Sequence, residues 1–231
     1  MTAAPGSEPA PEPAPGQGDY FANHARARRF PWTLYHRPLE ADLGKFLRQV
    51  AAEHPAGEIL VVGCGLLHEI DAAPSGLRFH VVDIDPRAVD AVLARQDPRI
   101  LGGTVVLPEE PISLAALGRA GRGFAGVYAK EVIEHVLSWP AWLTGLRRAL
   151  LPSGWLWLST PNYGEPWLPA LEATALELIA RRSGFSRRHL HPTRFSARAL
   201  ARGLSAAGFE SVRTKVTPTR LAITAWARAP R

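Results

Sequence analysis

The stretch from Glu58 to Gly65, Glu-Ile-Leu-Val-Val-Gly-Cys-Gly, constrains the fold of this chain more than any other. Ile59 to Val62 is a short apolar run without alternation, which is typical of a strand buried on both faces. It ends at Gly63, Cys64 and Gly65, where two glycines permit a tight turn and a close approach of the backbone to a ligand. Because open α/β sheets bind nucleotides at the carboxyl ends of their strands, we expect a nucleotide-like ligand at this turn.

A second apolar run, from Leu77 to Val82, ends in Asp83, which lies 18 residues after Gly65. A carboxylate at the tip of the neighbouring strand accepts hydrogen bonds from both hydroxyls of a ribose. The spacing therefore predicts that Asp83 binds the ribose of a nucleoside that lies across the glycine turn.

Two longer motifs follow along the chain. Residues Phe124 to Val136 contain Lys-Glu-Val-Ile-Glu-His, and residues Leu151 to Asn162 contain Pro-Ser-Gly and then Ser-Thr-Pro-Asn. With all four motifs in this order, the chain resembles the class I S-adenosylmethionine-dependent methyltransferases. The most similar branch contains the ubiquinone-biosynthesis O-methyltransferases. The resemblance extends from Glu58 to Asn162 and is looser outside these limits.

This resemblance implies an α/β fold with a Rossmann-like, seven-stranded, mostly parallel sheet, its last strand antiparallel and helices on both faces. Strands that alternate with helices along the sequence favour a mostly parallel sheet on their own. The resemblance also implies S-adenosylmethionine as the cofactor, lying across the glycine turn with its ribose on Asp83. The further cofactor contacts that it implies are Gly63, Cys64, Gly65, Ile84, Lys130 and, near the adenine, Glu109 or Glu110.

Two positions depart from the pattern of the family. An acidic residue usually stands two positions before the first glycine, where this chain has Val61, and a third glycine usually stands where this chain has Leu67. In the family that acid helps to order the glycine turn and to contact the methionine end of the cofactor. Glu58 and Glu69 are the candidate substitutes for it.

Glu131, Glu134 and His135 are the candidate catalytic residues. We expect a helix from about Glu131 to Leu150, with a break or restart at Trp139-Pro140. In such a helix the three side chains stand at i, i+3 and i+4 and share one face beside the cofactor.

Two interpretations of these three residues stay open. Two carboxylates and an imidazole on one face can ligate Mg²⁺ or another divalent metal, with His189 or His191 as a further ligand. Methyltransferases that share Glu-x-x-Glu-His use these positions for a metal that grips vicinal hydroxyls, so the resemblance implies the same site. Alternatively, a carboxylate and the histidine act as a base without metal.

The sequence divides into three parts. Residues 1–18 are rich in Pro, Ala, Gly and Glu and are expected to be disordered, because they offer little apolar surface to bury. Residues 19–56 are expected to form an N-terminal lid and a helix. Residues 57–231 are the expected methyltransferase domain, with an acceptor-side insertion at about 163–191.

The aromatic segment from Phe30 to Pro38 contains two prolines, Pro31 and Pro38, and is not expected to form a regular helix. It is either a lid over the cofactor, with Tyr35, His36 and Arg37 facing the site, or an anchor of the N-terminus. The following segment, Leu39 to Ala52, has apolar residues at helical spacing and predicts an amphipathic helix.

Composition limits the class of protein. The formal net charge is +6, and residues 181–231 carry 12 basic residues and a single acid, Glu210. Such a surface suits an anionic partner such as nucleic acid, but a solvated arginine-rich face also explains it and is the interpretation that we favour. The single cysteine, Cys64, excludes an internal disulfide and has no partner for nucleophilic catalysis. No apolar stretch is long enough to span a membrane, and we expect a cytoplasmic protein.

The function that these observations favour is S-adenosylmethionine-dependent methylation of an oxygen on a small-molecule or lipid-like acceptor. Two alternatives remain: methylation of RNA, and a degenerate methyltransferase fold that serves as a binding module. The sequence leaves the oligomeric state open.

Overall fold

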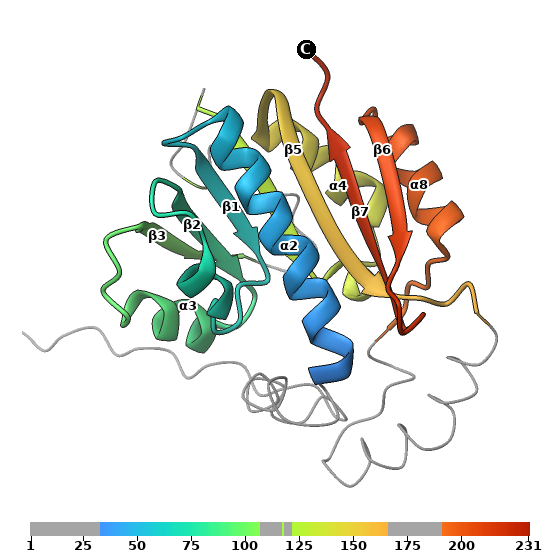
Figure 1. Ribbon diagram of the computed structural model, residues 1–231, viewed down its shortest axis with the longest axis horizontal. Helices are drawn as coiled ribbons and strands as arrows, with labels where there is room; N and C mark the ends of the chain where they lie inside the picture. The colour runs from blue at the N-terminus through green and yellow to red at the C-terminus, as the bar shows by residue number, and fades with distance from the viewer. Residues whose placement is uncertain (1–32, 107–116, 118–121, 166–190) are drawn as a thin grey trace, which may run out of the picture.

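The computed structural model describes residues 33–106, 117, 122–165 and 191–231. In this part of the chain seven strands form one sheet in the order β3-β2-β1-β4-β5-β7-β6 (Figure 1). β7 runs antiparallel to both of its neighbours, and the other pairs are parallel, which confirms the predicted sheet. The strands are β1 (Glu58–Val62), β2 (Arg78–Asp83), β3 (Ile100–Val105), β4 (Phe124–Lys130), β5 (Leu150–Pro161), β6 (Glu210–Val216) and β7 (Ala222–Arg228).

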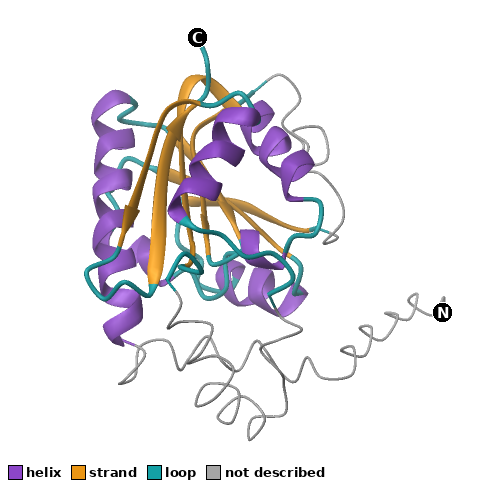
Figure 2. Cartoon of the chain, turned by 90° about the vertical axis from the view of Figure 1, so that its right-hand side faces the viewer, coloured by secondary structure: helices purple, strands orange, loops and turns teal. Residues whose placement is uncertain are grey.

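Helices cover both faces of the sheet, as predicted. The long helix α2 packs against one face, and α4 and α8 pack against the other (Figure 2). None of the helices in the described ranges is both long and apolar enough to cross a membrane. The helical elements are α2 (Thr33–Glu53), the 3₁₀ turn η1 (His68–Ala72), α3 (Pro86–Leu93), the 3₁₀ turn η2 (Ile133–His135), α4 (Trp139–Ala149) and α8 (Ala197–Ala206).

The N-terminal helix corrects one expectation. Residues 30–32 lie outside the described range, but the rest of the segment expected to be irregular is helical from Thr33, with Pro38 inside the helix. Pro38 stands near the start, where few intrahelical hydrogen bonds are lost, so packing outweighs its cost. The residues that pack are Leu39, Leu43, Phe46, Leu47 and Val50, which are all buried.

Asp42 fixes α2 over strands β5 and β7. One of its carboxylate oxygens, Oδ2, accepts hydrogen bonds from the indole N–H of Trp157 in β5, at 3.0 Å, and of Trp226 in β7, at 2.9 Å. α2 begins at the carboxyl ends of the parallel strands, where the hydroxyl of Tyr35 donates to the carboxylate of Glu131, directly after β4.

The helix expected to begin at Glu131 is also partly wrong. The chain forms only the turn η2 there, and a regular helix begins at Trp139, with Pro140 in its first turn. Glu131 has a φ of +58°, which a right-handed helix does not admit. The restart at Trp139-Pro140 is as predicted.

Candidate active site

The glycine turn follows β1 and is hydrogen-bonded to the end of β2. The N–H groups of Gly63 and Cys64 donate to the carbonyl of Val82, at 2.9 and 3.2 Å. Gly63 has a φ of +70°, and a Cβ added there would lie 2.5 Å from Cγ2 of Val132. Gly65 has a φ of +49°. The first glycine is therefore required both by backbone conformation and by space.

Asp83 lies at this turn and fastens it. Its Oδ2 accepts from the N–H of Gly65 and its Oδ1 from the N–H of Asp85, each at 3.0 Å. A carboxylate oxygen has lone pairs for more than one donor, so these bonds leave capacity for the hydroxyls of a ribose. Ile84, the next residue, is 59% exposed and offers an apolar surface beside the same carboxylate.

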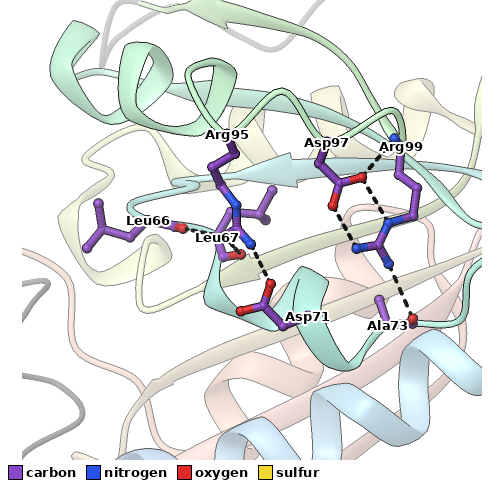
Figure 3. A network of polar contacts seen from close by, with 7 residues as sticks. All are labelled: Leu66, Leu67, Asp71, Ala73, Arg95, Asp97 and Arg99. Atoms are coloured by element: carbon purple, nitrogen blue, oxygen red, sulfur yellow. Dashed lines mark hydrogen bonds and ion pairs between the residues drawn. The ribbon is translucent and has the colours of Figure 1, made fainter.

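Leu67 stands where the family has its third glycine, and it adopts the left-handed conformation with a φ of +48°. Arg95 holds this strained segment from outside (Figure 3). Its Nη1 donates to the carbonyls of Leu67, at 3.0 Å, and Leu66, at 3.3 Å, and its Nη2 forms an ion pair with Asp71. These contacts and the burial of the Leu67 side chain offset the cost of a non-glycine residue at this position.

Only one of the two candidate substitutes for the missing acid reaches the glycine turn. Glu69 of η1 forms an ion pair with Lys130, at the carboxyl end of β4. Glu58 lies at the opposite end of β1, where His80 Nε2 approaches its carboxylate to 3.4 Å. The structure therefore brings Glu69, and not Glu58, near the position that Val61 leaves without charge.

Charge at this end of the site is settled by burial and by the ion pair. Burial alone would raise the pKa of Glu69, but the Lys130 ammonium, a backbone hydrogen bond and His68 together outweigh burial, and the pKa is lowered. Burial, together with Lys130, lowers the pKa of His36 to about 4, so this imidazole is neutral at pH 7. Burial raises the pKa of Cys64, which stays a thiol and fills space, as expected for a residue without a nucleophilic role.

Glu131 follows directly after β4 and lies on the α2 side of the sheet. Ser159 Oγ donates to its Oε1 at 2.7 Å, and the hydroxyl of Tyr35 donates to its Oε2. Continued strand alternation would place Glu131 on the opposite face from Lys130, and the positive φ turns it to the same face instead. Burial raises the pKa of Glu131, while both hydroxyl donors act to lower it.

Glu134 and His135 belong to a separate cluster with His191. Ligand atoms of these three residues lie within 4.8 Å of one another. Thr160 Oγ1 donates to Glu134 Oε2 at 3.1 Å, and the Tyr163 hydroxyl lies 2.6 Å from His191 Nδ1. His191, one of the two histidines named as a further ligand, thus lies in this cluster.

The expectation that Glu131, Glu134 and His135 share one helix face is wrong. Ser159 and Thr160 are consecutive in β5 and so face opposite sides of the sheet. Each holds one of the two carboxylates, so Glu131 and Glu134 lie on opposite sides of β5, although the charge of His191 still acts on Glu131 and lowers its pKa.

Some predicted residues lie outside the described ranges: Glu109, Glu110, His189, the 1–18 tail and most of the acceptor-side insertion. The sequence reasoning gave no role to Ser159, Thr160 or Arg95. The Ser-Thr pair of the strand motif carried a signal, because adjacent hydroxyls at a strand end reach both faces of the sheet. Arg95 carried none.

Comparison with known families gives one match over most of the chain: residues 34–214 fit the family model described as a methyltransferase domain. The search of curated proteins found no match.

Several solved structures share the fold. A chain from the complex between the Haloferax volcanii Trm112 methyltransferase activator and a protein described as a methyltransferase is 14% identical, with a TM-score of 0.65 over 93% of this chain and 99% of that chain. The N-methyltransferase NodS of Bradyrhizobium japonicum, bound to S-adenosyl-L-homocysteine, is 16% identical, with a TM-score of 0.58 over 92% and 98%. Phosphoethanolamine N-methyltransferase 2 of Haemonchus contortus, bound to S-adenosyl-L-methionine, is 14% identical, with a TM-score of 0.58 over 81% of this chain and 53% of that chain.

Proposed function

Because this chain belongs to the methyltransferase domain family, and is on that ground an S-adenosylmethionine-dependent methyltransferase, we propose that it methylates an oxygen of a small-molecule or lipid-like acceptor. The observation that carries the proposal is Glu131, a half-buried carboxylate with two hydroxyl donors directly after β4. A hydroxyl acceptor must lose a proton when it is methylated, and a positioned base serves that need.

The residues at the turn fit the cofactor. Asp83 would bind the ribose, the backbone of Gly63 to Gly65 would lie against the nucleoside, and Ile84 would contact the adenine. When bound, S-adenosylmethionine supplies an electrophilic methyl group on a sulfonium. The chain's own task is to hold the acceptor oxygen in line and to take up its proton, and positioning of this kind accounts for much of the rate in such reactions.

Glu131 is suited to that proton transfer. Burial raises its pKa toward the working pH, and a base is most effective when its pKa lies near that pH. Tyr35 Oη and Ser159 Oγ fix the two carboxylate oxygens, so the direction in which the proton is accepted is defined.

We also propose that a divalent metal, if the reaction uses one, is held by Glu134, His135 and His191 rather than by Glu131. When Nδ1–H of His191 donates to Tyr163, Nε2 is the nitrogen with a lone pair for a cation. Three protein ligands leave positions for water and for oxygens of the acceptor. A bound divalent cation would favour acceptors with vicinal hydroxyls.

The test uses the full chain with methyl-labelled S-adenosylmethionine. Catechols, prenylated phenols, phosphoethanolamine and total RNA are offered separately, and the labelled product is identified by mass spectrometry. We expect a methyl ether that forms on the phenolic acceptors and is lost in Glu131→Gln. Label on nitrogen, or label on RNA alone, would overturn the proposal. EDTA treatment followed by Mg²⁺, Mn²⁺ or Zn²⁺ tests the metal separately.

RNA remains the second candidate acceptor because basic side chains are exposed on α8 and β6, namely Arg198, Arg202, Arg213 and Lys215. Binding through such side chains weakens steeply with salt. A salt-dependent affinity for RNA together with labelled RNA in the screen would favour it over the small acceptor.

A further inference from the structure

A polar group inside the core points to a subsite beside the glycine turn. The Tyr128 hydroxyl is fully buried and has no hydrogen-bond partner among the described residues. A buried hydroxyl without a partner is costly and calls for an explanation such as a ligand. Burial, and then the nearby negative charge of Glu69, raise the pKa of Tyr128, so the phenol keeps its proton.

Tyr128 lies beside the position that lost its acid. In the register of β1 and β4 it is the partner of Val61, and Lys130 follows two residues later on the same face. The charges at this place therefore come from η1 and β4 instead of β1: Glu69 supplies the carboxylate and Lys130 the ammonium.

The Glu69–Lys130 ion pair is poorly explained by a contribution to stability alone. The two side chains are only 9% and 23% exposed, and a buried ion pair is weak support for stability because desolvation cancels much of its attraction. Neutral His36 adds no third charge. One fixed anion and one fixed cation beside an unpartnered hydroxyl are complementary to an amino acid zwitterion.

We propose that Lys130 binds the α-carboxylate and Glu69 the α-ammonium of the methionine end of the cofactor. The pair thus replaces the acid that Val61 removes. The inference rests on the proposed function and extends it to the residues that select a donor with an intact amino acid end.

The strand order supports the direction of binding. β1 lies between β2 and β4, so Asp83 at the tip of β2 and Lys130 at the tip of β4 stand on opposite sides of the glycine turn. A ligand with its ribose on Asp83 that crosses Gly63 to Gly65 therefore directs its other end to Lys130.

Two probes separate this subsite from the rest of the cofactor site. S-adenosylhomocysteine has the amino acid end, whereas 5′-methylthioadenosine has the nucleoside and the thioether without it. Both are titrated calorimetrically into the wild-type chain, Lys130→Met and the double variant Glu69→Gln/Lys130→Met, which leaves no unpaired buried charge. Lys45→Met, an exposed lysine on α2, is the matched control.

We expect Lys130→Met and the double variant to weaken the affinity for S-adenosylhomocysteine by about tenfold or more, which corresponds to the loss of a charge-assisted hydrogen bond. The affinity for methylthioadenosine should change by less than about twofold. Lys45→Met should change neither. Equal losses for both probes, or no loss in the folded double variant, would overturn the subsite while cofactor binding stands. Failure of the wild-type chain to bind either probe would instead overturn the proposed function.

Discussion

Lys130 and Glu131 are neighbours in the chain, yet they belong to two regions of the site that are built in different ways. Lys130 belongs to the donor region, which comprises Gly63–Gly65, Glu69, Asp83 and Lys130. Glu131 belongs to the acceptor region, which comprises Glu131, Glu134, His135, Ser159, Thr160 and His191.

The donor region is held by main-chain hydrogen bonds and one ion pair among β1, η1, β2 and β4. The acceptor region is held by hydroxyl groups that come from distant parts of the chain: Tyr35 stands 96 residues from Glu131, and Ser159 stands 28. The difference teaches that the proposed donor region depends on the backbone of a local turn, whereas the proposed acceptor region depends on long-range packing. Variants of the two regions should therefore fail in different ways.

The largest effect is expected at Gly63. Gly63→Ala should lower the free energy of unfolding by about 2 to 4 kcal/mol, because alanine is disfavoured at positive φ and its Cβ would overlap Val132. Urea denaturation measures this loss. In the matched control, Gly102→Ala in β3, the nearest atom lies 4.0 Å from the added Cβ, and the change should stay within about 1 kcal/mol. Equal losses at the two glycines would show that the turn is not the constrained element.

Much of the fold follows from local pattern, and the donor region follows with it. Ile59–Val62 and the two glycines identified β1 and its turn because burial on both faces leaves a continuous apolar run. The position of Asp83 beside this turn could be predicted because the ends of adjacent parallel strands meet at one edge of the sheet. The choice between Glu58 and Glu69 needed the structure, since it depends on which end of β1 each residue reaches.

The acceptor region was predicted in composition but not in arrangement. Nothing in the sequence Lys-Glu-Val-Ile-Glu-His indicates that Glu131, which is not glycine, adopts a φ of +58°. That one torsion replaces an expected helical turn and sends Glu131 and Glu134 to opposite faces. The helical start of α2 was missed for a related reason, because the contribution of tertiary packing outweighs the local cost of Pro38.

The two regions should respond to pH in opposite directions. The folded chain holds His36 neutral down to a pKa of about 4, against an ordinary value of 6.5, so between these values the unfolded chain binds more protons. Stability is therefore lost as the pH falls from 6.5 toward 4, by at most about 3 kcal/mol for this group. His36→Gln should flatten the loss in urea titrations across that range.

Glu131 provides the contrast, because its pKa is raised from the ordinary 4.5 by burial. Its contribution to stability is present below pH 4.5 and is lost as the pH rises through the folded pKa. Glu131→Gln should thus remove a loss of stability that begins as the pH rises above 4.5, whereas His36→Gln removes a loss that occurs as the pH falls. If the two variants change the slope of stability against pH in the same direction, the two regions are not distinct electrostatically.

Asp83 tests the donor region by affinity. Asp83→Ala should weaken the affinity for S-adenosylhomocysteine by about 10- to 100-fold, because it removes the acceptors for a ribose and the hydrogen bond from the N–H of Gly65. Asp83→Asn keeps one carbonyl acceptor and should lose less. Glu134→Gln in the acceptor region should leave the affinity within about twofold. Calorimetry decides, and an unchanged dissociation constant in Asp83→Ala would remove this residue from the cofactor site.

The smallest effects are expected from Ser159→Ala and Thr160→Val, because each variant loses one hydrogen bond, which contributes about 1 kcal/mol. The Ser159 hydroxyl acts to lower the pKa of Glu131, so its removal raises that pKa. The acidic limb of the plot of methylation rate against pH should then move to higher pH. Thr160 holds Glu134, so Thr160→Val should weaken Mn²⁺ binding, measured by calorimetry, and leave the limb in place. Each variant is the control for the other, because the hydroxyls are adjacent in β5 and face opposite sides of the sheet. If either variant shifts both the limb and the metal affinity, the two carboxylates act as one unit and the separation of the acceptor region into two faces does not hold.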